Sequence, residues 1–267
     1  MLSSIKKLLR PERAQQTLPA VPEGERYYVI GDIHGCLDHF AALADAIDAD
    51  AADNAAYNTT VVLLGDLVDR GPDSAGVIAK AREWGEQRSL RFLAGNHEEM
   101  FLESFSDLEM LRHFVKHGGR ETILSYGIPK KEYRELTLEE LQDKIGEIVP
   151  QADRDFLASF EEMIIAGDYV FAHAGIDPSR PLDDQRRKDL LWIRERFLRS
   201  TEPLSHVIVH GHTIFEDVED CGTRIGIDTG AFRTGILTAL VLEGSARRTI
   251  QAVEKDGQIH IEKTEDK

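Results

Sequence analysis

Two short stretches in the first third of the chain constrain its fold more than any other feature. In each, an apolar run (Tyr27–Ile30 and Val61–Leu64) is followed by a glycine and a carboxylate, Asp32 and Asp66. Runs this short, partly β-branched and closed by glycine, are typical of buried strands in an α/β sheet. Ligands of such sheets bind beyond the carboxyl ends of the strands. We therefore expect Asp32 and Asp66 at the rim of one cleft.

The size and charge of the chain narrow the function classes. Its 267 residues are enough for one large domain with a full core. A formal net charge of -16 argues against nucleic acid as a partner, because phosphate binding depends on lysine and arginine. The two cysteines match neither a disulfide framework nor a zinc spacing. With no secretion signal and no apolar membrane span, we expect a cytoplasmic protein that binds no membrane.

Strand, loop and helix alternate through the first hundred residues, which is the pattern of a layered α/β sheet. Apolar residues at helical spacing predict a helix over about 37–49, followed by a loop at 51–58. A second helix is expected from Ser74 to about Gly85, capped by Asp73 or Ser74. The third strand is expected at Leu90–Leu93.

The pattern changes after about residue 98. The sequence from about 98 to 165 is mostly helical and strongly charged, and we interpret it as a helical insert on one side of the cleft. Strands are expected again at 169–172 and 207–209, and a β-meander over 224–253. The predicted organisation is a tail and linker (1–25), a single domain (26–262) and a loose tail (263–267).

Five of the predicted strand ends carry residue types that bind metals. They are Asp32 with His34, Asp66, Asn96 with His97, His173, and His210 with His212. Carboxylate and amide oxygens together with imidazole nitrogens suit Mn, Fe or Zn better than an all-oxygen calcium site. These donors are too many for one ion, and two metals about 3.5–4 Å apart are the usual arrangement for phosphate ester hydrolysis. Asp32 and His34 leave their strand in the same direction, so both can reach one ion, and Asp66 can bridge.

The same residues closely resemble the phosphoprotein-phosphatase family of the calcineurin-like metallophosphoesterases. The resemblance is carried by five motifs: GDIHG (31–35), GDLVDRG (65–71), GNHE (95–98), HAG (173–175) and HGHT (210–213). It implies a four-layer α/β/β/α sandwich with two divalent metals between the sheets, most simply Mn²⁺, with Fe, Zn or Mg as alternatives. It implies that Asp32 and His34 hold the first metal and that Asp66 bridges. The second site would be completed by Asn96, His173 and His212.

The resemblance also implies roles for the residues around the metals. His97 would be the general acid, and Asp69 would keep its imidazolium populated. Arg70 and Arg194 would hold the phosphate oxygens, with Asn96 also facing the phosphate. For Arg194 an ordinary helix-surface role stays open, because other arginines are close in sequence: Arg186, Arg187, Arg196 and Arg199. His210 would close its strand and bind no metal.

The reaction that the resemblance implies is direct hydrolysis of a phosphate ester by a metal-bridging water or hydroxide. The dinucleotide-cleaving branch of the family tends to have alanine in place of Asp69, GNHD in place of GNHE, and GHW in place of GHT. The segment GGRETILSYG (118–127) looks like one found in bacterial and phage-type serine/threonine phosphatases. We therefore expect a serine/threonine protein phosphatase of broad specificity, with a phosphoprotein or phosphopeptide as substrate. The alternatives are symmetrical hydrolysis of dinucleoside tetraphosphates and an inactive metal-binding interaction module. The sequence leaves the oligomeric state open.

Overall fold

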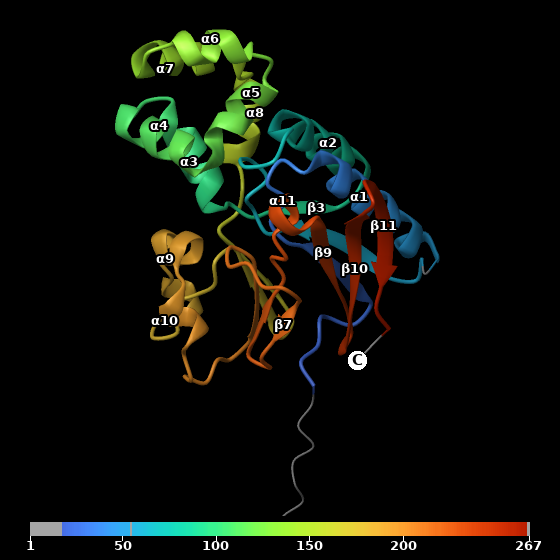
Figure 1. Cartoon of the computed structure of the whole chain (residues 1–267). Coiled ribbons are helices and arrows are strands. Elements are labelled where there is room, and N and C mark those ends of the chain that lie inside the picture. Colours follow the sequence, from blue (N-terminus) through green and yellow to red (C-terminus); the bar gives the residue numbers. More distant parts are fainter. Residues whose placement is uncertain (1–17, 54, 266–267) are drawn as a thin grey trace, which may run out of the picture.

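The computed structural model describes residues 18–53 and 55–265. Two β-sheets pack face to face, and helices cover their outer sides, as Figure 1 shows. The α/β/β/α sandwich expected from the sequence is therefore confirmed. Within the described residues, none of the helices combines the length and apolar character needed to cross a bilayer. The first seventeen residues of the predicted N-terminal tail lie outside the described part of the chain.

The first sheet has six strands in the order β11-β10-β9-β1-β2-β3. The strands β1 to β3 are parallel, whereas β9, β10 and β11 form antiparallel hairpins beside β1. Its elements are β1 (Glu25–Ile30), α1 (Leu37–Asp53), β2 (Asn58–Leu63), α2 (Ser74–Gln87), β3 (Leu90–Phe92), β9 (Ile236–Glu243), β10 (Ala246–Lys255) and β11 (Gln258–Lys263).

The second sheet has five strands in the order β4-β5-β6-β8-β7, with parallel pairing from β5 through β6 to β8. The helices α9 and α10 lie beside it in Figure 1. Its elements are β4 (Met163–Ala166), β5 (Tyr169–Ala172), the 3-10 turn η2 (Leu182–Asp184), α9 (Arg187–Trp192), α10 (Glu195–Leu198), β6 (Val207–His210), β7 (Glu219–Asp220), β8 (Arg224–Gly226) and α11 (Ala231–Thr234).

In the sequence, six helices and one π-helical turn lie between β3 of the first sheet and β4 of the second. In Figure 1 they gather at one end of the molecule, above the sheets. They are α3 (Asn96–Ser104), α4 (Leu108–Phe114), η1 (Val115–Gly119), α5 (Arg120–Ser125), α6 (Lys130–Glu135), α7 (Leu138–Ile148) and α8 (Gln151–Ala158). The turn η1 contains Gly118 at a φ of 116°, where the chain changes direction.

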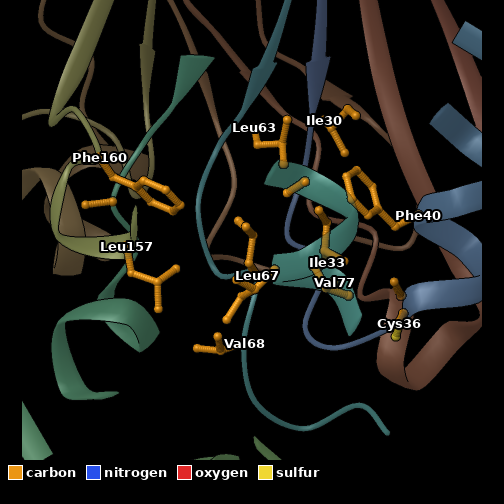
Figure 2. Close-up of a cluster of buried hydrophobic side chains, with 14 of the residues drawn as sticks. Ile30, Ile33, Cys36, Phe40, Leu63, Leu67, Val68, Val77, Leu157 and Phe160 are labelled. Atoms are coloured by element: carbon orange, nitrogen blue, oxygen red, sulfur yellow. The ribbon is translucent and has the colours of Figure 1, made fainter. Parts of the chain in front are cut away.

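The core follows from the period of two along each strand, because successive side chains point to opposite faces. In β1, Val29 faces the space between the two sheets, whereas Ile30 faces the helix layer. In β5, Phe171 points between the sheets and Val170 points outward. Figure 2 shows the helix-side layer, in which Ile30 and neighbouring residues pack against the helices. Both faces are apolar at these two strands, so their buried parts, 27–30 and 169–172, are continuous apolar runs.

Three details differ from the prediction. Helix α1 continues to Asp53, through residues expected to form a loop, because its alanine-rich end favours a helix. Strand β4 was not predicted, because only four residues separate the last helix from it and only four form it. The expected meander over 224–253 is divided: β8 belongs to the second sheet, and the antiparallel hairpins begin at Ile236 and continue through β11.

Candidate metal centre

The loops after four strands meet at one edge of the sandwich. Because β1 and β2 are parallel and in register (Ile30 with Leu63), the residues that follow them emerge side by side. The same holds for β5 and β6, which carry His173 and His212 to this edge. Asp66 adopts a φ of 51° and His212 a φ of 62°. Left-handed conformations of non-glycine residues are strained and cluster at functional sites.

Two groups of potential ligands share Asp66. One group joins it to His34 and His97, and the other joins it to His173 and His212, with all residues buried. The Asp66 Oδ2 atom lies 3.5 Å from Nε2 of His34, and Oδ1 lies 3.5 Å from Nε2 of His173. One carboxylate oxygen therefore faces each group. This is the position that a bridging ligand requires.

Asp32 and Asn96 each contact a histidine of the second group. Both carboxylate oxygens of Asp32 accept from the backbone N–H of His212, at 3.0 and 3.2 Å. Asn96, at the start of α3, places Oδ1 3.0 Å from Nε2 of His173. Four of the six residues that the sequence predicts as metal ligands therefore belong to the two groups, and Asn96 contacts one of them. Asp32 belongs to neither group and is held beside them by the backbone of His212, whereas His97, which was not predicted to be a ligand, belongs to the first.

The histidine tautomers leave nitrogen lone pairs in the centre. His34 Nδ1 is 2.8 Å from the carbonyl of Val68, and His173 Nδ1 is 2.8 Å from that of Leu64. Because each Nδ1–H donates to a carbonyl, each neutral imidazole keeps a lone pair on Nε2 that can act as an acceptor or ligand, and on His34 this nitrogen accepts from Arg70. The buried Nε2 of His212 has no hydrogen-bond partner among the described residues. The centre therefore presents lone pairs of nitrogen and oxygen atoms. This set of ligand atoms fits divalent cations.

The pKa values follow from burial and from the crowding of charges. Burial lowers the pKa of His34 and His173, and it lowers that of His212 to about 2, so these imidazoles stay neutral. Burial alone would raise the pKa of Asp66, but the surrounding histidines, His173 first, outweigh it and lower the pKa. Burial raises the pKa of Asp32, and the nearby carboxylates add to this.

His97 and Asp69 form a buried pair beside these ligands. His97 Nδ1 donates to Asp69 Oδ2 at 2.5 Å, and Thr122 Oγ1 donates to the other oxygen of Asp69 at 2.7 Å. Burial alone would lower the pKa of His97, but the charge of Asp66 and the bond to Asp69 outweigh it and raise the pKa. The pair therefore orients an imidazole and favours its protonated form.

Comparison with protein families matches residues 25–229 to the calcineurin-like phosphoesterases. The chain belongs to this family. It is 29% identical over 243 residues to serine/threonine-protein phosphatase 1 of Salmonella typhimurium, covering 86% of this chain and 98% of that protein. It is 29% identical over 227 residues to the asymmetrical bis(5'-nucleosyl)-tetraphosphatase PrpE of Bacillus velezensis, covering 76% of this chain and 84% of that protein.

A solved structure agrees on the fold. The cold-active protein-tyrosine phosphatase of a psychrophilic Shewanella species superimposes with a TM-score of 0.54 at 19% identity, covering 91% of this chain and 83% of that one. Calcineurin-like phosphoesterases use a dinuclear metal site, and the two ligand groups that share Asp66 fit such a site.

The two predicted phosphate-binding arginines of this calcineurin-like phosphoesterase lie in different surroundings. The half-buried guanidinium of Arg70 donates to Nε2 of His34 at 2.7 Å and to Nε2 of His97 at 2.9 Å. It also lies over the ring of Phe232, 4.9 Å from the centroid. Arg194 is exposed at the start of α10, and its positive charge lowers the pKa of His173 and His212. Both arginines therefore act on the centre electrostatically.

Two buried acids were not assigned a role at the site from the sequence. Glu98 accepts from the backbone N–H groups of Asp66 at 2.8 Å, Leu67 at 2.7 Å and Gly95 at 2.9 Å, so it ties the second motif to the third. Asp228 follows β8 and raises the pKa of Asp32. Its sequence signal, an apolar residue, an acid and a nearby glycine, is the one that identified Asp32. His210 belongs to neither ligand group and packs against Phe197 and Phe215.

Proposed function

We propose that this calcineurin-like phosphoesterase hydrolyses phosphoserine and phosphothreonine esters in proteins. The observation that carries the proposal is the buried pair of His97 and Asp69, joined at 2.5 Å. A serine or threonine alkoxide is strongly basic and needs a proton as it leaves, which a positioned imidazolium supplies. A nucleoside phosphate is a far weaker base and leaves without such help. A general acid held this firmly therefore favours an alkyl monoester as substrate.

The proposed metal ligands divide as the resemblance implies. Asp32 and His34 hold the first cation, Asp66 bridges, and the second is held by three residues: Asn96, His173 and His212. Mixed oxygen and nitrogen donors suit Mn²⁺, which is our proposal for the metal. When bound, the two cations lower the pKa of water and neutralise phosphoryl oxygens.

The chain supplies the remaining groups. Arg70 and Arg194 hold the phosphoryl oxygens. Without substrate, Arg70 donates to Nε2 of His97, so this nitrogen can carry a proton only when Arg70 has turned to the phosphate. His97 then donates that proton from Nε2 to the leaving oxygen while Nδ1 stays bound to Asp69. The choice of Arg194 is supported by its neighbours, because Arg196 and Arg187 are already paired with carboxylates. Arg194 forms no hydrogen bond or ion pair through its side chain with the described residues, so its guanidinium is available to substrate.

The segment 118–127 supports the protein-phosphatase branch, because it builds the catalytic pair. Thr122 fixes Asp69 through its hydroxyl and also accepts from the Asp69 N–H at 2.8 Å. The Gly118 carbonyl accepts from the backbone N–H of Arg70 at 3.1 Å. A Cβ at Gly118 would lie 2.7 Å from Cγ of Arg70, so glycine is needed for this contact. The signature that resembles bacterial serine/threonine phosphatases therefore has a structural purpose at this site.

The second candidate substrate is a dinucleoside tetraphosphate, which the names of relatives such as PrpE support. The test is a parallel measurement of kcat/KM for a phosphoserine peptide and for diadenosine tetraphosphate with the Mn²⁺-loaded protein. We expect the peptide to be the better substrate. Faster cleavage of the dinucleotide would overturn the proposal, and its products, two ADP or ATP with AMP, would define the symmetry. No turnover of either compound or of p-nitrophenyl phosphate would instead indicate an interaction module.

A further inference from the structure

Asp228 is carried to the metal centre by the strand that precedes it. Strand β8 is parallel to β6, and Ile227 extends the pairing by donating its N–H to the carbonyl of His210 at 2.9 Å. The loop after β8 also lies directly against the first motif. A Cβ at Gly31 would lie 2.6 Å from the carbonyl oxygen of Ile227 and 3.5 Å from Cα of Asp228. Only glycine at position 31 allows this approach, so the sequence of the first motif accommodates direct contact between the two loops.

The Asp228 side chain is 1% exposed, and its two oxygens differ. Oδ1 accepts from the backbone N–H of Gly230 at 2.8 Å. Oδ2 is buried and has no hydrogen-bond partner among the described residues. A buried carboxylate oxygen without a donor is costly unless it has a further partner. The carboxyl group next to it is that of Asp32, which lies within hydrogen-bonding reach of Asp228 but offers no donor when it is ionised.

The loop does not need the second oxygen for its own structure. Thr229 Oγ1 donates to the carbonyl of Ile236 at 2.7 Å and contacts Oγ1 of Thr238 at 2.9 Å. Thr234 Oγ1 donates to the carbonyl of Thr229 at 2.6 Å. These bonds, together with the one from Gly230 to Oδ1, hold the turn. The remaining oxygen of Asp228 is therefore available to a ligand.

We propose that Asp228 supplies a further carboxylate oxygen, Oδ2, to the cation position formed by Asp32 and His34. This inference rests on the metal centre of the proposed function and adds a residue to it. The loops of β1, β2 and β8 would each bring one carboxylate to the same side of the site. In metal-free protein these three buried acids repel one another, and a cation relieves the repulsion.

The test is Asp228→Asn, with Mn²⁺ alone as the probe. Equilibrium dialysis followed by metal analysis gives the stoichiometry and affinity, and thermal unfolding is followed with and without Mn²⁺. We expect one of the two Mn²⁺ ions to bind about 10–100-fold more weakly. We also expect the increase in Tm on adding Mn²⁺ to become smaller than in the wild-type protein.

A matched control is Asp153→Asn, which makes the same change at a buried acid paired with Arg82 and Tyr126. It should lower Tm equally with and without Mn²⁺ and leave both ions bound. Asp228→Ser provides a second variant, because its hydroxyl can still accept from Gly230 while Oδ2 is absent. We expect both Asp228 variants to weaken the binding of the same Mn²⁺ ion. Either variant alone is enough for the test if the other folds poorly.

Two outcomes would overturn the inference. If Asp228→Asn or Asp228→Ser lowers Tm equally in both states and binds two Mn²⁺ ions with wild-type affinity, Asp228 serves only the turn. If the wild-type protein itself binds no Mn²⁺, the metal centre and this inference fail together. If the wild-type protein binds two ions but hydrolyses no phosphopeptide, only the proposed substrate fails, because the readout for Asp228 is binding.

Discussion

Two clusters of charge in this calcineurin-like phosphoesterase, one partly buried and one fully buried, are compensated in different ways. In the outer cluster, which lies between α1 and the first sheet, Asp50 accepts hydrogen bonds from Tyr28, Arg248 and Lys263. Both oxygens of the Asp50 carboxylate therefore accept hydrogen bonds from side chains of the protein itself. Its burial is therefore compensated within the fold, and it needs no ligand.

The metal centre is the opposite case. Asp32, Asp66 and Asp228 are all buried, and the imidazoles beside them stay neutral. The nitrogen of His212 and one oxygen of Asp228 have no hydrogen-bond partner among the described residues. The carboxylate of the outer cluster is paired by the chain itself, whereas the candidate metal centre keeps polar atoms that a ligand can bind. The two clusters allow this difference to be tested with matched substitutions.

The largest effect is expected for Asp66→Asn. The amide keeps the shape of the side chain but loses the charge that lets two oxygens face two cations. We expect loss of bound Mn²⁺, measured by metal analysis after dialysis, together with loss of p-nitrophenyl phosphate hydrolysis. Asp50→Asn is the matched control and should keep both. A variant at Asp66 with full Mn²⁺ content and full rate would contradict the assignment of a bridging ligand.

The next effect is expected for His97→Asn, which removes the acid and leaves the other ligands. On an alkyl phosphate such as a phosphoserine peptide, kcat should fall by about 10²–10⁴-fold. On p-nitrophenyl phosphate the loss should be much smaller, because nitrophenolate leaves without a proton. Metal content should stay close to wild type, because His97 is not one of the six proposed ligands. Equal losses on the two substrates would show that His97 acts through the metals and is not the acid.

The metal-centre half of this contrast could be predicted from the sequence, but the outer cluster could not. Asp32, Asp66 and His173 each follow an apolar run, and the parallel register of the strands places them at one edge. Asp228 carries the same signal, but β8 has only three residues, so it gives little strand pattern. Nothing in the sequence predicted the outer cluster. Asp50 and Arg248 are far apart in sequence, and each looks like an ordinary surface residue.

The third prediction concerns the stability of the outer cluster. Removing the Asp50 carboxylate leaves the donors of Tyr28, Arg248 and Lys263 with a weaker partner, so Asp50→Asn should lower the free energy of unfolding by about 1.5–3 kcal/mol at pH 7. Burial alone would raise the pKa of Asp50, but the bonds from Arg248, Tyr28 and Lys263 outweigh it and lower the pKa.

The sign of the pH dependence follows from this lowered pKa. The stabilisation by Asp50 is fully present above the pKa of an unfolded aspartate, about 3.9, and is lost as the pH falls toward the folded value. Urea unfolding of wild type and Asp50→Asn should therefore show a large difference at pH 7 that shrinks below about pH 4. A difference that is constant over this range would mean that packing, and not charge, is what the variant removes.

The smallest effect is expected for Phe232→Leu. This change tests how the arginines of the two clusters, Arg248 and Arg70, are held. Arg248 is paired with a carboxylate, but Arg70 pairs with none among the described residues and lies over the Phe232 ring instead. An aromatic face steadies a guanidinium without neutralising it, so Arg70 keeps its charge for phosphate. Phe232→Leu keeps apolar bulk and removes the ring face, and KM should rise by about 2–5-fold, corresponding to ~0.5–1 kcal/mol, with kcat and Mn²⁺ content little changed. Phe215→Leu, whose ring lies by Arg224, is the control and should leave KM unaltered.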